Sequence, residues 1–230
     1  MNIRLNMKKL SILLVLTLYF SCSYIENSEI ISTHENGNKK TVHIFINHND
    51  DLNYIVENYY PNGQMEFRGR LHNNIQEGHW TWWYENGTKK DETYFINGQY
   101  SKFRKHWRPD GTRLSFEYLT NSCTSECCDG KVIYFDSLNN VELIVNRKNG
   151  DRNGRTILYF PNGNVDQIYN YKLGLLDSIK YEYYPNGKLK VYGYYILDKE
   201  QGKWVYFDTS GNNIGYETYI DGIVVEPTRK

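Results

Sequence analysis

Short turn sequences recur along this chain at a nearly constant interval. They include HENG, YPNG, YENG, RPDG and FPNG, and the series is continued by FDSL ending at Leu138 and by FDTSG ending at Ser210 or Gly211. Successive spacings are 26, 24, 24, 27, 25, 24 and 23 or 24 residues. The glycines of these turns are Gly37, Gly63, Gly87, Gly111, Gly163, Gly187 and Gly211. Such a period indicates a repeat architecture, in which each unit packs on its neighbours.

Each period predicts a β-hairpin followed by a looser return turn. In GHWTWWYENGTKKDETYFING, Gly78–Gly98, two aromatic-rich segments are joined by Asn86-Gly87 and closed by Asn97-Gly98. Asn-Gly between alternating residues is typical of a type I′ turn, because both central residues need a positive φ. No window has the apolar spacing of an amphipathic helix. We therefore expect an all-β fold, an elongated repeat array of about eight antiparallel β-hairpins forming a single twisted sheet.

Two columns of mostly aromatic residues follow the same period. Adjacent residues of a strand point to opposite faces, so the columns are expected on opposite sides of the sheet. Six residues after two of the turns stand Gly69 and Gly193, which indicates a bulge or a close backbone approach. Four residues before the turn stand Tyr59, Trp83, Trp107, Tyr134, Tyr159, Tyr183 and Tyr206. Three residues before it stand Tyr60, Tyr84, Phe135, Phe160, Tyr184 and Phe207, with Arg108 as the exception.

The composition excludes several classes of protein. An aromatic content of 16% with 22 Tyr argues against disorder, although the mean hydropathy is −0.69. The formal net charge is zero and no basic block stands out, so no nucleic-acid partner is expected. The sequence contains no nucleophile elbow, P-loop, HExxH motif or dinucleotide-binding glycine pattern. We therefore expect no enzyme, no cofactor, and neither catalytic nor metal-binding residues.

The first residues predict an export signal. Three basic residues precede an apolar run from Leu10 to Phe20, which is too short to span a bilayer. Ser21 precedes Cys22, and this segment resembles the bacterial lipoprotein signal, in which the cysteine is lipidated and becomes the new N-terminus. The resemblance implies an exported protein of the bacterial cell envelope, anchored to a membrane through Cys22. An ordinary secreted protein with an incidental cysteine and an uncleaved membrane anchor are the alternatives.

The expected organisation has four parts. Residues 1–21 form the signal peptide and 22–31 a lipid-anchor tether. The hairpin repeats occupy 32–223, with an irregular insertion at 118–131, and 224–230 form a C-terminal tail.

The insertion carries three cysteines, Cys123, Cys127 and Cys128. In an exported protein this density favours a disulfide, and Cys123 with either Cys127 or Cys128 would close a small loop. One cysteine is then left over. Free thiols and a metal site are the alternatives, and the metal site lacks a nearby fourth ligand.

The units GHWTWWYENGTKKDETYFING and QGKWVYFDTSGNNIGYETYIDG resemble MORN repeats (membrane occupation and recognition nexus), in the bacterial variant with the pattern G-x-W-x-x-[YF]-[YF]-x-x-G. The resemblance covers roughly residues 32–223. It implies an elongated antiparallel sheet used as a scaffold or binding surface. Bacterial members of this variant include antitoxins and immunity proteins for secreted toxins.

We expect a non-catalytic scaffold that binds another protein. The alternatives are an antitoxin or immunity protein that neutralises a toxin by direct binding, and a carbohydrate-binding or envelope-structural protein. The candidate binding surface is the tryptophan group Trp80, Trp82, Trp83 and Trp107. Such residues form either a ligand platform or ladder rungs that pack one repeat on the next. A single-layer sheet cannot cover both aromatic columns, so one face is expected to be exposed or covered by a partner.

The lipid anchor makes a testable prediction. When the Cys22→Ser variant is expressed with labelled palmitate, it should lose both the label and its presence in the membrane fraction. The reason is that Cys22 is the residue expected to carry the acyl chains that attach the protein to the membrane. The wild-type chain is the control. Label and membrane fraction unchanged in the variant would show that Cys22 is not the anchor.

Overall fold

The computed structural model describes residues 27–46, 51–123 and 128–227, and all of its regular structure is β. Nineteen strands form one sheet. The strands are β1 (Asn27–Thr33), β2 (Lys39–Phe45), β3 (Asn53–Tyr59), β4 (Met65–His72), β5 (Ile75–Trp83), β6 (Lys89–Ile96), β7 (Gln99–Trp107), β8 (Arg113–Leu119), β9 (Gly130–Phe135), β10 (Val141–Lys148), β11 (Asp151–Arg152), β12 (Gly154–Tyr159), β13 (Val165–Lys172), β14 (Leu175–Leu176), β15 (Ser178–Tyr183), β16 (Leu189–Ile196), β17 (Lys199–Phe207), β18 (Asn213–Ile220) and β19 (Ile223–Pro227).

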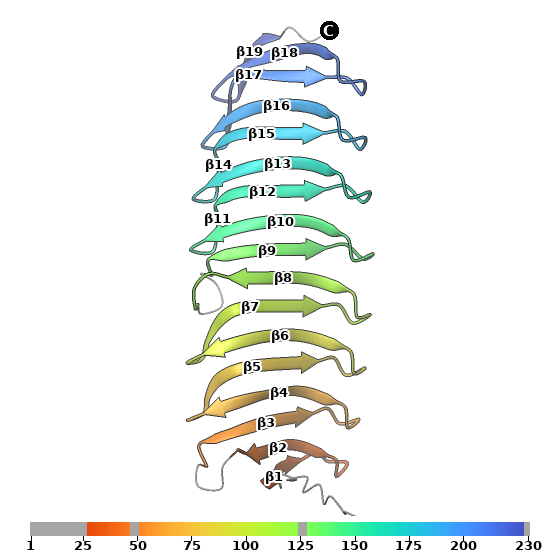
Figure 1. Cartoon of the computed structure of the whole chain (residues 1–230), viewed down its shortest axis with the longest axis vertical. Coiled ribbons are helices and arrows are strands. Elements are labelled where there is room, and N and C mark those ends of the chain that lie inside the picture. The colour runs from red at the N-terminus through yellow and green to blue at the C-terminus, as the bar shows by residue number, and fades with distance from the viewer. Residues whose placement is uncertain (1–26, 47–50, 124–127, 228–230) are drawn as a thin grey trace, which may run out of the picture.

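The strands follow one another through the sheet in chain order, each antiparallel to the next (Figure 1). The two-residue strands β11 and β14 lie at return turns, so β10 also pairs with β12, and β13 with β15. Hairpins thus stack along one axis, and β19 covers β18 at the C-terminal end. The prediction of a single all-β sheet of hairpin repeats is confirmed.

The sheet is longer than expected at both ends. Strand β1 begins at Asn27, inside the segment 22–31 interpreted as a tether. Strand β19, Ile223–Pro227, lies mostly in the segment 224–230 interpreted as a tail. The return turn at Asp221 reverses the chain, so that these last residues pair with β18. The predicted signal peptide lies outside the described residues.

The hairpin turns are not the type I′ turns that Asn-Gly predicted. At Asn86-Gly87 only the glycine has a positive φ, +83°. The Gly87 N–H donates to the Tyr84 carbonyl at 2.8 Å, and the Tyr84 N–H donates to the Thr88 carbonyl at 2.8 Å. This is a type I turn followed by a left-handed glycine, which forms a bulge in the hairpin. Type I′ geometry occurs at return turns instead, as at Asn97 (+49°) and Gly98 (+73°).

Asparagine is favoured in the hairpin turns because its side chain both accepts and donates. The Asn86 Oδ1 accepts from the Thr88 N–H at 3.0 Å, and its Nδ2 donates to the Pro109 carbonyl of the next turn at 2.9 Å. Four other turns donate to the following turn in the same way, through Asn36, Asn62, Asn162 and Asn186. Each of these turns is therefore bonded to its neighbour.

The column three residues before the turn also links successive repeats. The Tyr84 hydroxyl donates to the Trp107 carbonyl of the next repeat at 2.9 Å, and Arg108, the exception in the column, donates to the Phe135 carbonyl at 2.6 Å. The equivalent bond is made by His34, Tyr60 and Tyr184. These side chains belong to the turns, so the column bridges repeats instead of lining a second face of the sheet.

Two turns end one residue later than the aromatic columns predicted. In the fifth hairpin the residue with a positive φ is Asn139, at +66°, and not Leu138. The Asp136 carboxylate accepts from the Leu138 and Asn140 N–H groups at 2.8 Å, which closes the turn without a glycine. Phe135 thus stands where Tyr134 was expected. The last turn, expected to end at Ser210 or Gly211, has Gly211 as its left-handed residue, so Phe207 stands where Tyr206 was expected.

The single layer has two faces, which we name by strand β5: face A carries Trp80 and Trp82, and face B carries Thr81 and Trp83. By strand alternation, most of the strongly buried apolar side chains lie on face A. They include Tyr54, Val56, Trp80, Phe95, Val132, Val145, Val191 and Trp204.

Glycine in one strand makes room for tryptophan in the next. A Cβ added to Gly69 of β4 would lie 2.0 Å from the Trp80 ring of β5. Trp80 is only 4% exposed, and its Nε1 donates to the Arg70 carbonyl at 3.1 Å. Gly193 and Trp204 repeat this arrangement, again with 2.0 Å between the added Cβ and the ring. The strand pairing shifts register at both glycines, so bulge and close approach occur together.

Replacing Gly69 by alanine tests this packing. We expect Gly69→Ala to lower the free energy of unfolding by about 2–3 kcal/mol, because overpacking forces the ring or backbone to move. Chemical denaturation measures the loss. In a Trp80→Val background, which copies Val132 of a later repeat, the same change should cost much less.

Gly154→Ala is the matched control, because Gly154 has a φ of +83° and no atom within 4 Å of the added Cβ. It should lose only about 1–2 kcal/mol from backbone strain. A loss in Gly69→Ala no larger than this, or one that persists undiminished in the Trp80→Val background, would contradict the packing argument.

Candidate binding surface

The structure separates the four candidate tryptophans between the two faces. On face A the Trp80 and Trp82 rings stack, with centroids 5.6 Å apart and 26° between their planes. On face B, Trp107 meets Phe116 edge to face at 5.7 Å, and the Lys89 ammonium lies 5.2 Å from the Trp107 centroid. Trp83 points to the same face as Trp107 by alternation. The four rings therefore do not form one platform.

Trp80 belongs to the core of the N-terminal repeats. It is buried in one cluster with Tyr54, Val56 and Phe95, and Trp82 packs against the edge of that cluster. Trp80 is thus a ladder rung, whereas Trp82 remains partly exposed.

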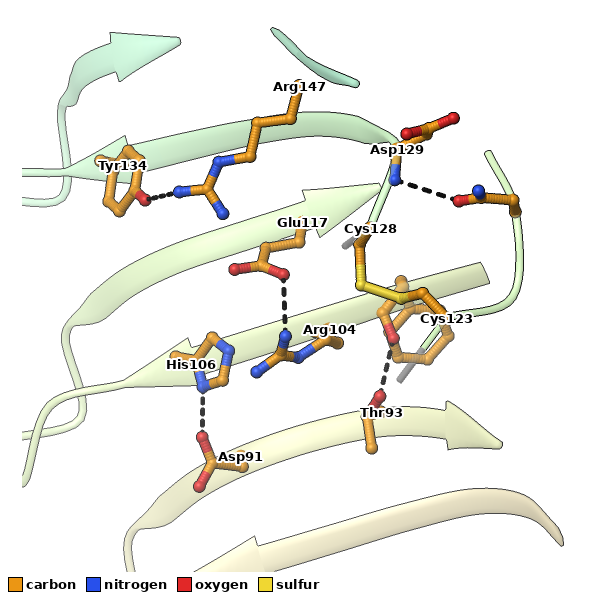
Figure 2. A network of polar contacts seen from close by, with 12 residues as sticks. Asp91, Thr93, Arg104, His106, Glu117, Cys123, Cys128, Asp129, Tyr134 and Arg147 are labelled. Atoms are coloured by element: carbon orange, nitrogen blue, oxygen red, sulfur yellow. Dashed lines mark hydrogen bonds and ion pairs between the residues drawn. A yellow bond between two sulfur atoms is a disulfide. The ribbon is translucent and has the colours of Figure 1, made fainter. Parts of the chain in front are cut away.

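A shallow pocket of about 270 Å³ lies beside Trp82 on face A. Its walls include Tyr100, Asp91, Arg104 and His106. Figure 2 shows the polar residues: His106 contacts Asp91 through Nδ1, and Arg104 reaches Glu117 of the next strand at 3.4 Å. The Arg104 guanidinium also lies 4.4 Å from the Tyr100 centroid. These charged groups are already paired within the protein.

The insertion is fastened to the sheet close to this network. A disulfide joins Cys123 to Cys128 (Figure 2). Cys123 also exchanges two backbone hydrogen bonds of 2.8 Å with Tyr100 of β7. Of the two pairings left open by the sequence, the structure therefore has Cys123–Cys128. Cys127 and Cys22 lie outside the described residues.

A continuous row of paired residues crosses the middle of face B, from β2 to β18. We call it the central row. Each member is the direct cross-strand partner of the next, so the side chains lie side by side. The members are Val42, Glu57, Arg68, Thr81, Glu92, Lys105, Phe116, Ile133, Ile144, Ile157, Ile168, Tyr181, Tyr192, Val205 and Tyr216.

The N-terminal part of the central row is mostly charged, and its charges are paired within the protein. Arg68 bonds to the buried Glu57. The Glu92 carboxylate accepts from Lys89 at 3.0 Å and from His79 at 2.8 Å. Burial raises the pKa of Glu92, but hydrogen bonds from Lys89 and His79 and the nearby charges outweigh it, so its pKa lies below the usual value. This part of the row already satisfies its own charges.

The C-terminal part of the central row is apolar, from Phe116 to Tyr216, and we call it the apolar track. Its side chains are half-buried except for Ile168, which is buried. The aromatic column four residues before the turns borders the track. Ring contacts join track to column at Phe116–Phe135 (5.2 Å), Tyr181–Tyr183 (6.5 Å) and Tyr192–Phe207 (6.2 Å).

Sequence reasoning missed the apolar track. Its residues lie six positions before and five positions after the residue with a positive φ in each hairpin turn. The same positions in the earlier repeats carry charged residues such as Glu57, Glu92 and Lys105. Alignment on Asn139 and Gly211 would have shown the change from charged to apolar. Alignment on Leu138 and Ser210 displaces the track positions by one residue in these two repeats.

Other kinds of site find no support in the described residues. There, no three His, Cys, Asp or Glu side chains gather as a metal ion requires. No helix in the described ranges is long and apolar enough to cross a membrane.

Comparison with known families places repeats in three parts of the sheet. The family model of the MORN repeat variant matches residues 76–97, 152–173 and 176–196. Each match spans one hairpin with its turn: β5–β6, β12–β13 and β15–β16. No curated protein matches the chain. The three matches, together with the stacked hairpins, support a MORN-repeat protein.

Proposed function

We propose that this chain is a non-catalytic, protein-binding scaffold, exported and held at a membrane of the cell envelope by a lipid on Cys22. The observation that carries the proposal is the apolar track. It forms a row of apolar side chains on nine strands of a sheet that has only one layer, and all of them except Ile168 are partly exposed. Contiguous exposed apolar surface of this kind is typical of a protein-interaction site.

The stiffness of the array supports the same function. Side-chain hydrogen bonds from turn to turn, such as those of Asn86 and Tyr84, hold neighbouring repeats in register. A surface held in this way loses little conformational freedom when a partner binds, so more of the contact energy becomes affinity. MORN repeats often serve as modules that bind proteins or membranes, in agreement with this use.

The position of the expected anchor fits a scaffold as well. Cys22 precedes the first described strand, which begins at Asn27. A lipid on Cys22 would therefore hold the β1 end of the array next to the membrane. The apolar track begins at Phe116 and continues to the far end of the array, so it would remain accessible to a partner.

Site-directed photocrosslinking in the native cells tests the proposal. Benzoylphenylalanine is placed at Tyr181 or Tyr192 on face B, and at Tyr134 or Tyr171 on face A as matched positions. We expect a defined protein adduct, because a scaffold must touch its partner. Absence of a protein adduct at all four positions would contradict a protein-binding scaffold. A toxin as the crosslinked partner, with rescue from that toxin by this chain, would make the scaffold an immunity protein.

Carbohydrate binding is a second candidate, favoured by the aromatic wall that Trp82 and Tyr100 give the pocket on face A. A glycan array separates it from the scaffold. Under the scaffold proposal the purified chain should bind no glycan. Binding that is lost in Trp82→Ala and retained in the face-B control Trp107→Ala would establish the carbohydrate function instead.

A further inference from the structure

We infer that the apolar track receives an amphipathic helix of a partner protein, with carboxylates along one border of that helix. The inference rests on the proposed scaffold function and adds the face, the conformation and the charge of the partner segment.

A basic border flanks the track on the side of the return turns. Lys131, Arg155 and Lys203 each stand two residues before a track residue, so they share face B with the track. All three are exposed, and in the described chain none forms an ion pair with a carboxylate. Lys203 lies 4.1 Å from the centroid of Tyr216, a track residue. The border therefore offers positive charge without an ion pair beside apolar surface.

Two carboxylates lie near the basic border, Asp129 in one pocket with Lys131 and Glu226 within reach of the Tyr216 hydroxyl, but in the described chain neither forms an ion pair with the border. The other carboxylates beside the track are directed elsewhere. Glu117, Glu182 and Glu217 each adjoin a track residue in sequence and therefore point to face A. The N-terminal part of the central row differs, since Glu57 and Glu92 there neutralise the neighbouring cations. Carboxylates of a partner would supply the ion pairs that the basic border lacks in the described residues.

A helix fits this surface better than an extended peptide. The strands beneath the track are paired on both sides, so their backbone groups are unavailable to a strand laid over them. An extended segment on the apolar track would bury backbone N–H and C=O groups without partners, and each such group costs about 1–3 kcal/mol. An α-helix satisfies its backbone internally and presents only side chains.

The spacing of the border also suits a helix. Lys131 and Arg155 lie two strands apart, about 9.6 Å at the usual strand separation, and two helical turns rise about 10.8 Å. Carboxylates two turns apart on one helix would meet both cations. The part of the track that the basic border flanks, from Ile133 to Tyr216, crosses eight strands: β9, β10, β12, β13, β15, β16, β17 and β18. That is about 34 Å, the length of a helix of about 22 residues.

A flat anionic membrane is a poorer match for this edge. The return turns beside the basic border carry exposed charges of both signs, with Asp151, Asp198 and Asp221 beside Lys148, Arg152 and Lys199. A planar anionic surface brought against Lys131 and Arg155 would therefore gain little net attraction from these turns. A helix lying along the track reaches the border without covering the turns.

Two synthetic helical peptides of about 22 residues each, long enough to span this part of the track, test the inference. One carries leucine along one side and glutamate along the borders, and the other carries lysine in place of glutamate. Fluorescence anisotropy with the purified full chain measures binding. We expect the glutamate peptide to bind and the lysine peptide not to bind. Equal binding of the two peptides, or no binding of the glutamate peptide, would overturn the inference.

Charge reversal locates the site. The border variant Lys131→Glu/Arg155→Glu/Lys203→Glu should weaken binding of the glutamate peptide by about tenfold or more. The matched control Lys40→Glu/Lys90→Glu/Lys102→Glu changes three other exposed lysines and the net charge equally, and should leave binding within about twofold. Because all six residues are exposed, both variants should fold, which circular dichroism checks. Equal losses in the two variants would place the peptide elsewhere and contradict the inference.

Vesicles containing phosphatidylglycerol provide the competing surface. The chain could sediment with these vesicles, lose that binding in the border variant, and bind no peptide. This result would identify a membrane, and not a helix, as the ligand of the border. Protein adducts in cells without peptide binding would leave the scaffold standing and remove only this inference. Absence of adducts would remove the scaffold itself, so the two failures are distinguishable.

Discussion

Bonds between successive turns are the interaction on which this structure depends. A single-layer sheet has no second layer to pack on, so each repeat must be held by its neighbours. Tyr84 and Asn86 reach the backbone of the next repeat from one turn, and Arg108 continues the contact where tyrosine is absent. Because these bonds use the turns, they leave the strands free to vary on both faces.

That freedom explains how one fold carries two different surfaces. On face A, Gly69 and Gly193 leave room for the rings of Trp80 and Trp204, which pack against the sheet. On face B, the central row changes at Phe116 from charged residues, paired among themselves, to apolar residues. The backbone is the same along the whole row, so the side chains alone decide where a partner can bind.

The family model matches less of the chain than the hairpin repeats occupy. The family model matches 76–97, 152–173 and 176–196, whereas hairpins of the same kind occupy the described chain from β1 to β18. The fifth turn shows why a sequence pattern covers less. Asp136 and Asn139 close it with the backbone bonds that Tyr84 and Gly87 make elsewhere, although the residues have changed. Hydrogen-bond geometry is preserved where residue identity is not.

The sequence by itself determined the hairpin repeat, its period, most of the turn positions and the all-β fold, because turn residues and strand alternation act over a few neighbouring residues. Only the tertiary structure decided which tryptophan is buried, since Trp80 fills the space that Gly69 leaves on the neighbouring strand. It also chose Cys123–Cys128 and assembled the apolar track, whose members lie far apart along the chain. Cross-strand register brings them together, and register depends on every turn that precedes them.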